Sequence, residues 1–123
     1  MNKNTLIAFA PILFIACLQE PSDIKSGDEI RYEQLTKDLE SKGCSSNLEG
    51  LKLFLKNYPA SNRFDNIQMK LAQCYSSLGS DIASVDTYAN VSTESSFYPE
   101  ALLNIGAVKQ QSVKNFSFSQ SNT

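Results

Sequence analysis

The sequence predicts an all-α fold in which short helices pair as antiparallel hairpins. Apolar residues recur every three or four positions from residue 28 to about residue 112, and a glycine, a proline or a polar loop separates each amphipathic run from the next. No segment alternates apolar and polar residues with the period of two that is typical of a half-buried strand. A chain of 123 residues has the length of one domain with a modest core.

Five helices are expected. The first two each begin with a capping box, in which a serine caps a free backbone N–H and a glutamate reaches back. The boxes are Ser26 with Glu29 and Ser46 with Glu49. The first helix is expected to end at Gly43 and the second before Pro59, because these residues do not continue a helix.

The third helix is expected to run from about Ser61 to Gly79, the fourth to be capped by Asp81, and the fifth to have Pro99 in its first turn. Each of the five helices presents one apolar face. The faces are Tyr32, Leu35 and Leu39; Leu51, Phe54, Leu55 and Tyr58; Phe64, Ile67, Leu71, Ala72, Tyr75 and Leu78; Ile82, Val85, Tyr88 and Val91; Leu102, Ile105 and Gly106. Glu33 with Lys37 and Asp38 with Lys42 are expected to form i,i+4 ion pairs. Residues 113–123 have little to bury and are expected to be disordered.

Composition argues against several functional classes. The chain has a net charge of −2 and no basic stripe, which is not the pattern of a nucleic-acid-binding protein. It contains no histidine, the commonest general base and metal ligand. No phosphate-binding loop and no metal-ligand spacing is present. We therefore expect no enzymatic activity, no catalytic residue, no metal and no cofactor.

The first sixteen residues have the organisation of an export signal. A polar start with Lys3 is followed by an apolar run from Thr5 to Ala16, and Cys17 comes next. The run is shorter than the roughly 20 apolar residues that span a bilayer, and Pro11 interrupts it. Residues 1–16 are therefore predicted to be a cleaved signal peptide.

The segment Phe14-Ile15-Ala16-Cys17 resembles the lipobox of bacterial lipoproteins, although Phe14 stands where leucine is usual. This resemblance implies cleavage before Cys17, lipid attached to its thiol, and anchoring in a membrane of the cell envelope. In enterobacterial lipoproteins an aspartate after the cysteine retains the protein in the inner membrane, so Leu18 implies the outer membrane. The polar residues 17–27 would then form the lipidated tether. The alternative is an ordinary secretory signal in which Cys17 is incidental.

Tyr58-Pro59 recurs as Tyr98-Pro99, and an amphipathic helix precedes and follows each copy. Helix pairs with periods near 34 to 40 residues are typical of helical repeat proteins. The middle pair resembles a tetratricopeptide repeat at the positions Leu71-Ala72, Tyr75, Leu78-Gly79, Ser84, Tyr88 and Val91. In that family, small residues such as Ala72 and Ser84 mark where the two helices cross.

Flanking segments match the same repeat less completely, so the resemblance implies an α-solenoid of about two and a half repeats in residues 28–112. Gly50 and Phe54 fit the second helix of the first repeat, whereas Lys109 stands where a tyrosine is usual. The phrase from Phe54 to Ser61 is similar to tetratricopeptide lipoproteins of outer-membrane β-barrel assembly. A plain helical bundle without a superhelix is the alternative.

The resemblance also implies a function. Tetratricopeptide arrays bind peptides or partner helices on a concave face made by the first helix of each repeat. By position, that face would present Glu33, Lys37, Ser41, Asn66, Met69, Gln73 and Ser77. The hypothesis is a lipid-anchored adaptor that binds another envelope protein or peptide, with its oligomeric state left open. The alternative is a surface-exposed lipoprotein that contacts an external ligand.

Cys44 and Cys74 have two interpretations. Beyond the inner membrane, thiols meet an oxidising compartment, and a repeat stack would place the two cysteines near each other. A disulfide between them would close a loop of about 30 residues. The alternative is two separate thiols, with Cys74 buried as a small apolar residue and Cys44 in a loop.

Overall fold

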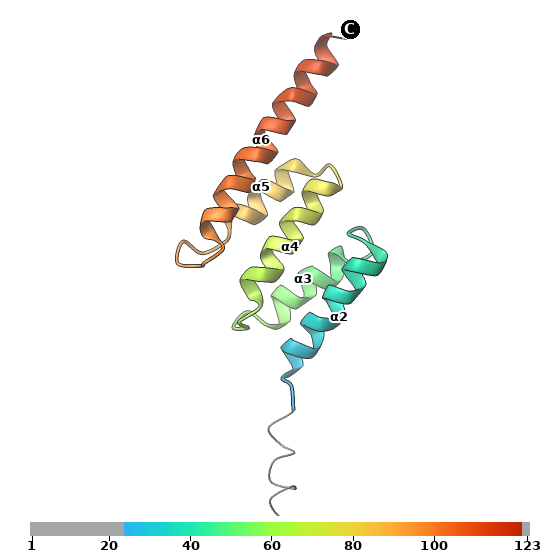
Figure 1. Ribbon diagram of the computed structural model, residues 1–123, viewed down its shortest axis with the longest axis vertical. Helices are drawn as coiled ribbons and strands as arrows, with labels where there is room; N and C mark the ends of the chain where they lie inside the picture. The colour runs from blue at the N-terminus through green and yellow to red at the C-terminus, as the bar shows by residue number, and fades with distance from the viewer. Residues whose placement is uncertain (1–23, 122–123) are drawn as a thin grey trace, which may run out of the picture.

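The computed structural model describes residues 24–121, and every regular element in this range is a helix. The elements are α2 (Gly27–Lys42), α3 (Leu48–Asn57), α4 (Phe64–Ser77), α5 (Asp81–Ala89) and α6 (Tyr98–Ser121). They follow one another along the long axis of the molecule, and the end of α6 projects beyond its neighbours (Figure 1). The all-α prediction is confirmed for this part of the chain. The predicted signal peptide, Cys17 and most of the tether lie outside the described residues.

Two predicted glycine stops are confirmed. Gly43 and Gly79 both have a φ of 81°, a left-handed conformation that costs glycine little because it has no Cβ. The N–H of Gly43 donates to the carbonyl of Leu39, and that of Gly79 donates to the carbonyl of Ser76. Each glycine therefore ends a helix and turns the chain toward the next.

Both predicted capping boxes are wrong. Ser26 precedes α2, but its side chain does not cap the helix, and Glu29 binds Arg63 instead of reaching back. α3 is preceded by Asn47, one residue after the predicted cap. The side chain of Asn47 instead donates to the carbonyl of Gly43 at 2.7 Å. Glu49 is exposed and pairs with Lys52, so tertiary and local partners displaced the predicted caps.

Other polar predictions also fail. Ser80, not Asp81, precedes α5, and the Asp81 carboxylate accepts a hydrogen bond of 2.5 Å from Ser112 in α6. Glu33 pairs with Lys25 rather than Lys37. Lys25 lies just before α2, and its side chain extends along the helix to Glu33. The Asp38–Lys42 pair is not among the ion pairs between residues 24 and 121.

The helices enclose two cores that share α4. The buried members of the first core, from α2 to α4, are Leu35, Leu51, Phe54, Ile67, Leu71 and Cys74. The buried members of the second core, from α4 to α6, are Met69, Ala72, Tyr88, Val91, Ala101 and Val108. α4 thus directs Ile67 and Leu71 to one side and Met69 and Ala72 to the other. The predicted apolar faces of the first three helices are confirmed, except that Leu78, directly after α4, is exposed.

The predicted faces of the last two helices are confirmed only in part. Val85, Tyr88 and Val91 pack in the second core, whereas Ile82 of α5 is 81% exposed. In α6, Ile105 packs against the same core, but Leu102 is 51% exposed. The residues of α6 that enter the core are Ala101 and Val108, so the predicted register was wrong by about one position. The run Ala101-Leu102-Leu103 fits several registers, and packing on α5 and α4 selects the one with the small residue inside.

The prediction of a disordered end after Ser112 is also wrong, because α6 continues to Ser121. Residues 113–121 contain neither glycine nor proline, so nothing in the sequence interrupts the helix that starts at Tyr98. The side chains of this last part are exposed. Among the described helices, none is long and apolar enough to cross a membrane.

Candidate partner-binding site

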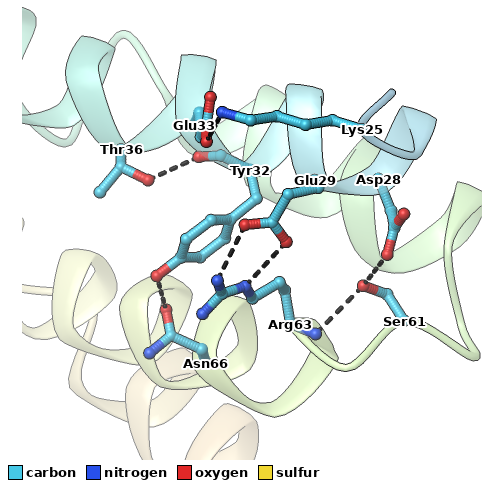
Figure 2. Close-up of polar contacts among 9 residues, drawn as sticks. All are labelled: Lys25, Asp28, Glu29, Tyr32, Glu33, Thr36, Ser61, Arg63 and Asn66. Atoms are coloured by element: carbon cyan, nitrogen blue, oxygen red, sulfur yellow. Dashed lines mark hydrogen bonds and ion pairs between the residues drawn. The ribbon is translucent and has the colours of Figure 1, made fainter. Parts of the chain in front are cut away.

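A polar cluster joins the start of α2 to the start of α4 (Figure 2). The guanidinium of Arg63 donates to both carboxylate oxygens of Glu29, at 3.0 and 2.8 Å, and stacks 4.4 Å from the centre of the Tyr32 ring. The Tyr32 hydroxyl donates to the side-chain carbonyl of Asn66 at 3.0 Å. Bidentate and stacking contacts of this kind fix direction as well as distance, so the cluster sets how α2 lies against α4.

A second pair of residues extends the cluster. Ser61 donates to the Asp28 carboxylate at 2.6 Å, and its oxygen accepts the backbone N–H of Arg63. Hydrogen bonds from Ser26 and Ser61 lower the pKa of Asp28, and the hydrogen bonds from Arg63 lower the pKa of Glu29. Both carboxylates are therefore better stabilised in their charged form than in water.

A disulfide ties the opposite end of the same helices. Cys44, in the turn after α2, is bonded to Cys74 of α4 with an S–S distance of 2.18 Å and a Cα–Cα distance of 5.1 Å. Cys74 is buried in the first core, and Cys44 packs against that core. Of the two interpretations of these cysteines, the structure has the bonded one. α2 and α4 are thus linked near both ends, by the polar cluster and by the disulfide.

Between these links lies a groove of about 300 Å³, here called the α2–α4 groove. It is lined by Thr36, Leu39, Glu40, Cys44, Lys70, Gln73, Cys74 and Ser77. Its polar lining includes Glu40 of α2 and Lys70 of α4, and the disulfide forms part of its wall. The linkage of the two helices therefore keeps this groove at a set width.

A neighbouring groove of about 410 Å³, the α4–α6 groove, lies on the other side of α4. It is lined by Gln73, Ser76, Ser77, Tyr88, Asn104, Ala107, Val108 and Gln111. Its lining has no charged side chain and is rich in amide and hydroxyl groups, which donate and accept hydrogen bonds. Burial raises the pKa of Tyr88, against the effect of a hydrogen bond with Asn104, so its hydroxyl stays protonated at neutral pH.

Gln73 and Ser77 line both grooves. Both side chains are exposed, and they stand one turn apart on α4. The structure thus brings together two of the predicted partner-binding residues at the ridge between the grooves. Glu33, Lys37 and Asn66 line neither groove: Glu33 pairs with Lys25, Lys37 is exposed, and Asn66 accepts the hydrogen bond from Tyr32.

Met69 does not fit its predicted role as an exposed contact. Its side chain is only 4% exposed and belongs to the second core with Ala101 and Val108. The prediction assigns it to the polar side of α4, but the second core, to which α5 and α6 both contribute, buries it. Sequence reasoning also missed several groove residues, chiefly Asn104 and Gln111. They stand seven residues apart on one side of α6, and that polar spacing could have shown them.

Within residues 24–121, no group of three or more histidine, cysteine, aspartate or glutamate side chains is placed to hold a metal ion. Comparison of the chain with protein-family models, with curated proteins and with solved structures finds no match.

Proposed function

We propose that this chain is a lipid-anchored adaptor of a bacterial cell envelope, which binds another envelope protein along the side of the molecule formed by α2, α4 and α6. The observation on which the proposal depends is the ridge of Gln73 and Ser77 between two grooves. A partner segment crossing the ridge would meet residues of all three helices. Amide and hydroxyl groups along its path suit the N–H and C=O groups of an extended peptide.

The spacing of the polar cluster supports a repeat arrangement of the tetratricopeptide kind. Glu29 binds Arg63 and Tyr32 binds Asn66, and both pairs are 34 residues apart. A separation of 34 residues is the length of a tetratricopeptide repeat. The first helix of one repeat would then contact its equivalent in the next, and a shallow concave side would result.

Anchoring completes the proposal. The apolar run up to Ala16 and the following Cys17 support signal cleavage and lipid attachment at the cysteine, in the outer membrane. A lipid anchor of two or three chains would hold the protein at the membrane, and the residues between Cys17 and α2 would act as the tether. The activity proposed is binding alone, with no chemical step.

Photocrosslinking in cells tests the adaptor role. A photoreactive amino acid at Gln73 should crosslink the membrane-anchored protein to a specific envelope protein. The matched control is the same group at Leu53 of α3, which is exposed but lines neither groove. A discrete product from position 73 and none from position 53 is expected. Equal products from both positions, or none from position 73, would contradict the proposal.

Protease treatment of whole cells distinguishes the envelope adaptor from a surface-exposed lipoprotein that contacts an external ligand. An adaptor inside the envelope should resist added protease until the outer membrane is permeabilised. Digestion in intact cells would contradict the internal location and favour the surface-exposed alternative.

A further inference from the structure

An apolar stripe runs along the side of α6 that borders α5. It consists of Leu102, Ile105, Val113 and Phe116, with Lys109 at its midpoint. Leu102, Val113 and Phe116 are 51%, 64% and 63% exposed, and Ile105 is half-buried. The successive spacings of three, four, four and three residues place all five on one side of a helix. Contiguous exposed apolar side chains on a helix are typical of an interaction site.

The stripe is symmetric about Lys109. Leu102 and Phe116 each stand seven residues from it, and Ile105 and Val113 each stand four residues from it. If a second copy of α6 lay antiparallel across the first, Leu102 of one copy would face Phe116 of the other. Ile105 would likewise face Val113. A surface that matches itself under a two-fold rotation is the requirement for a symmetric dimer.

A groove beside the stripe supplies the charges that this pairing needs. The α5–α6 groove has a volume of about 400 Å³ and is lined by Asp81, Ile82, Val85, Asp86, Lys109, Ser112 and Val113. Ile82 adds an exposed apolar side chain from α5. Asp81 already accepts a hydrogen bond from Ser112, whereas Asp86 is exposed at the groove. In the antiparallel register the Lys109 side chains of the two copies stand beside each other at the two-fold axis, and each can extend to the groove of the other copy, which Asp81 and Asp86 line.

We propose that two copies of this chain associate through antiparallel pairing of their α6 helices, with Lys109 of each copy meeting Asp86 of the other. The stripe is apolar at both ends and charged at its centre, and the carboxylate that complements the centre belongs to the same surface. A second copy satisfies both features at once. The inference is independent of the adaptor role, because its residues differ from those of the partner-binding ridge.

Crosslinking tests the pairing directly. Benzoylphenylalanine replaces Phe116 in the full-length chain, and Phe118 serves as the matched control. The two phenylalanines are similarly exposed, at 63% and 69%, but they point to nearly opposite sides of α6 because two residues turn a helix by about 200°. We expect a crosslinked pair of this chain from position 116, in at least tenfold higher yield than from position 118. Equal yields, no product, or a product with a different protein from position 116 would overturn the proposal.

Charge variants give a second test, read by co-purification of two differently tagged full-length chains. Phe116→Glu and Lys109→Glu should each lower recovery of the second tag at least tenfold, whereas Phe118→Glu should not. All three side chains are exposed, so circular dichroism should show unchanged helix content. Asp86→Lys combined with Lys109→Glu should restore recovery. Association that survives Phe116→Glu, or that is not restored by the charge exchange, would contradict the pairing.

Discussion

The hydroxyl of Ser84 donates a hydrogen bond of 2.8 Å to the backbone carbonyl of Ala72, where α5 crosses α4, and both residues are completely buried. The contact joins two small residues whose positions in the sequence predict a helix crossing. A small side chain is required on each helix, because the two backbones approach closely enough for a serine to reach across.

Ala72→Phe should destabilise the protein, because the larger ring has no space at this crossing. Overpacking of a core typically costs about 1–3 kcal/mol. The matched control is Gln73→Ala, one residue along but exposed on the groove side, which should change stability by less than about 0.5 kcal/mol. Thermal unfolding followed by circular dichroism measures both. A neutral Ala72→Phe together with a destabilising Gln73→Ala would show that the packing of α4 is different.

Removing the disulfide should lower stability without removing the fold. Cys44 and Cys74 are 30 residues apart. Closing a loop of this length lowers the entropy of the unfolded chain, which raises the free energy of unfolding by roughly 3–4 kcal/mol at 25 °C. Cys44→Ser should cost about this amount, and Cys74→Ser should cost more because it also places a hydroxyl in the first core. Denaturant unfolding gives the two values. Two thiols reactive to alkylation in the unfolded, unreduced protein would show that the bond does not form.

Acid should weaken the polar cluster between α2 and α4. The folded-state pKa values of Asp28 and Glu29 are lowered by their hydrogen bonds, so these carboxylates stabilise the fold at pH values above their unfolded pKa values of about 4. This stabilisation is lost as the pH falls through the lower folded pKa values. The melting temperature should therefore drop as the pH falls from about 5 to below the folded pKa values of the two carboxylates. The drop should be smaller in Glu29→Gln.

Arg63→Lys is the companion variant for this cluster, because lysine keeps the charge but cannot reproduce the two parallel hydrogen bonds or the stacking on Tyr32. It should lower the melting temperature at neutral pH nearly as much as Arg63→Ala. A lysine variant as stable as the wild type would mean that charge alone accounts for the contact.

Lipid attachment should depend on Cys17 and on no other cysteine. Radiolabelled palmitate is expected to enter the wild-type chain and Cys44→Ser, because Cys17 is the cysteine that follows the apolar signal run. Cys17→Ser should remain unlabelled. Labelling of Cys17→Ser to the wild-type level would remove the anchor from the proposed function.

Much of this fold could be predicted where side-chain size or backbone conformation decides the structure. Gly43 and Gly79 end helices because their left-handed conformation favours glycine, and Leu35, Phe54 and Ile67 are buried because their spacing follows the helical turn. Such constraints are local, or depend only on periodicity.

Partner choice among polar groups could not be predicted in the same way. Glu29 has a capping position nearby, yet it binds Arg63, which is distant in sequence and close only after folding. The site shows the same limit. Gln73 and Ser77 follow the polar side of α4, whereas Met69 is buried in the second core by residues of α5 and α6 that are distant in sequence.

The position of α4 between the two cores has a consequence for how the molecule unfolds. Ile67 and Leu71 cannot leave the first core without disturbing Met69 and Ala72 in the second, since all four belong to one continuous helix. The part of the chain before Gly79 holds every buried member of the first core, whereas the part after Gly79 lacks the α4 side of the second core. In the intact chain the two cores should consequently lose their structure in one cooperative transition. If the chain is divided in the turn at Gly79, the C-terminal fragment should fold only when mixed with the N-terminal one, because α4 supplies Met69 and Ala72 to the second core.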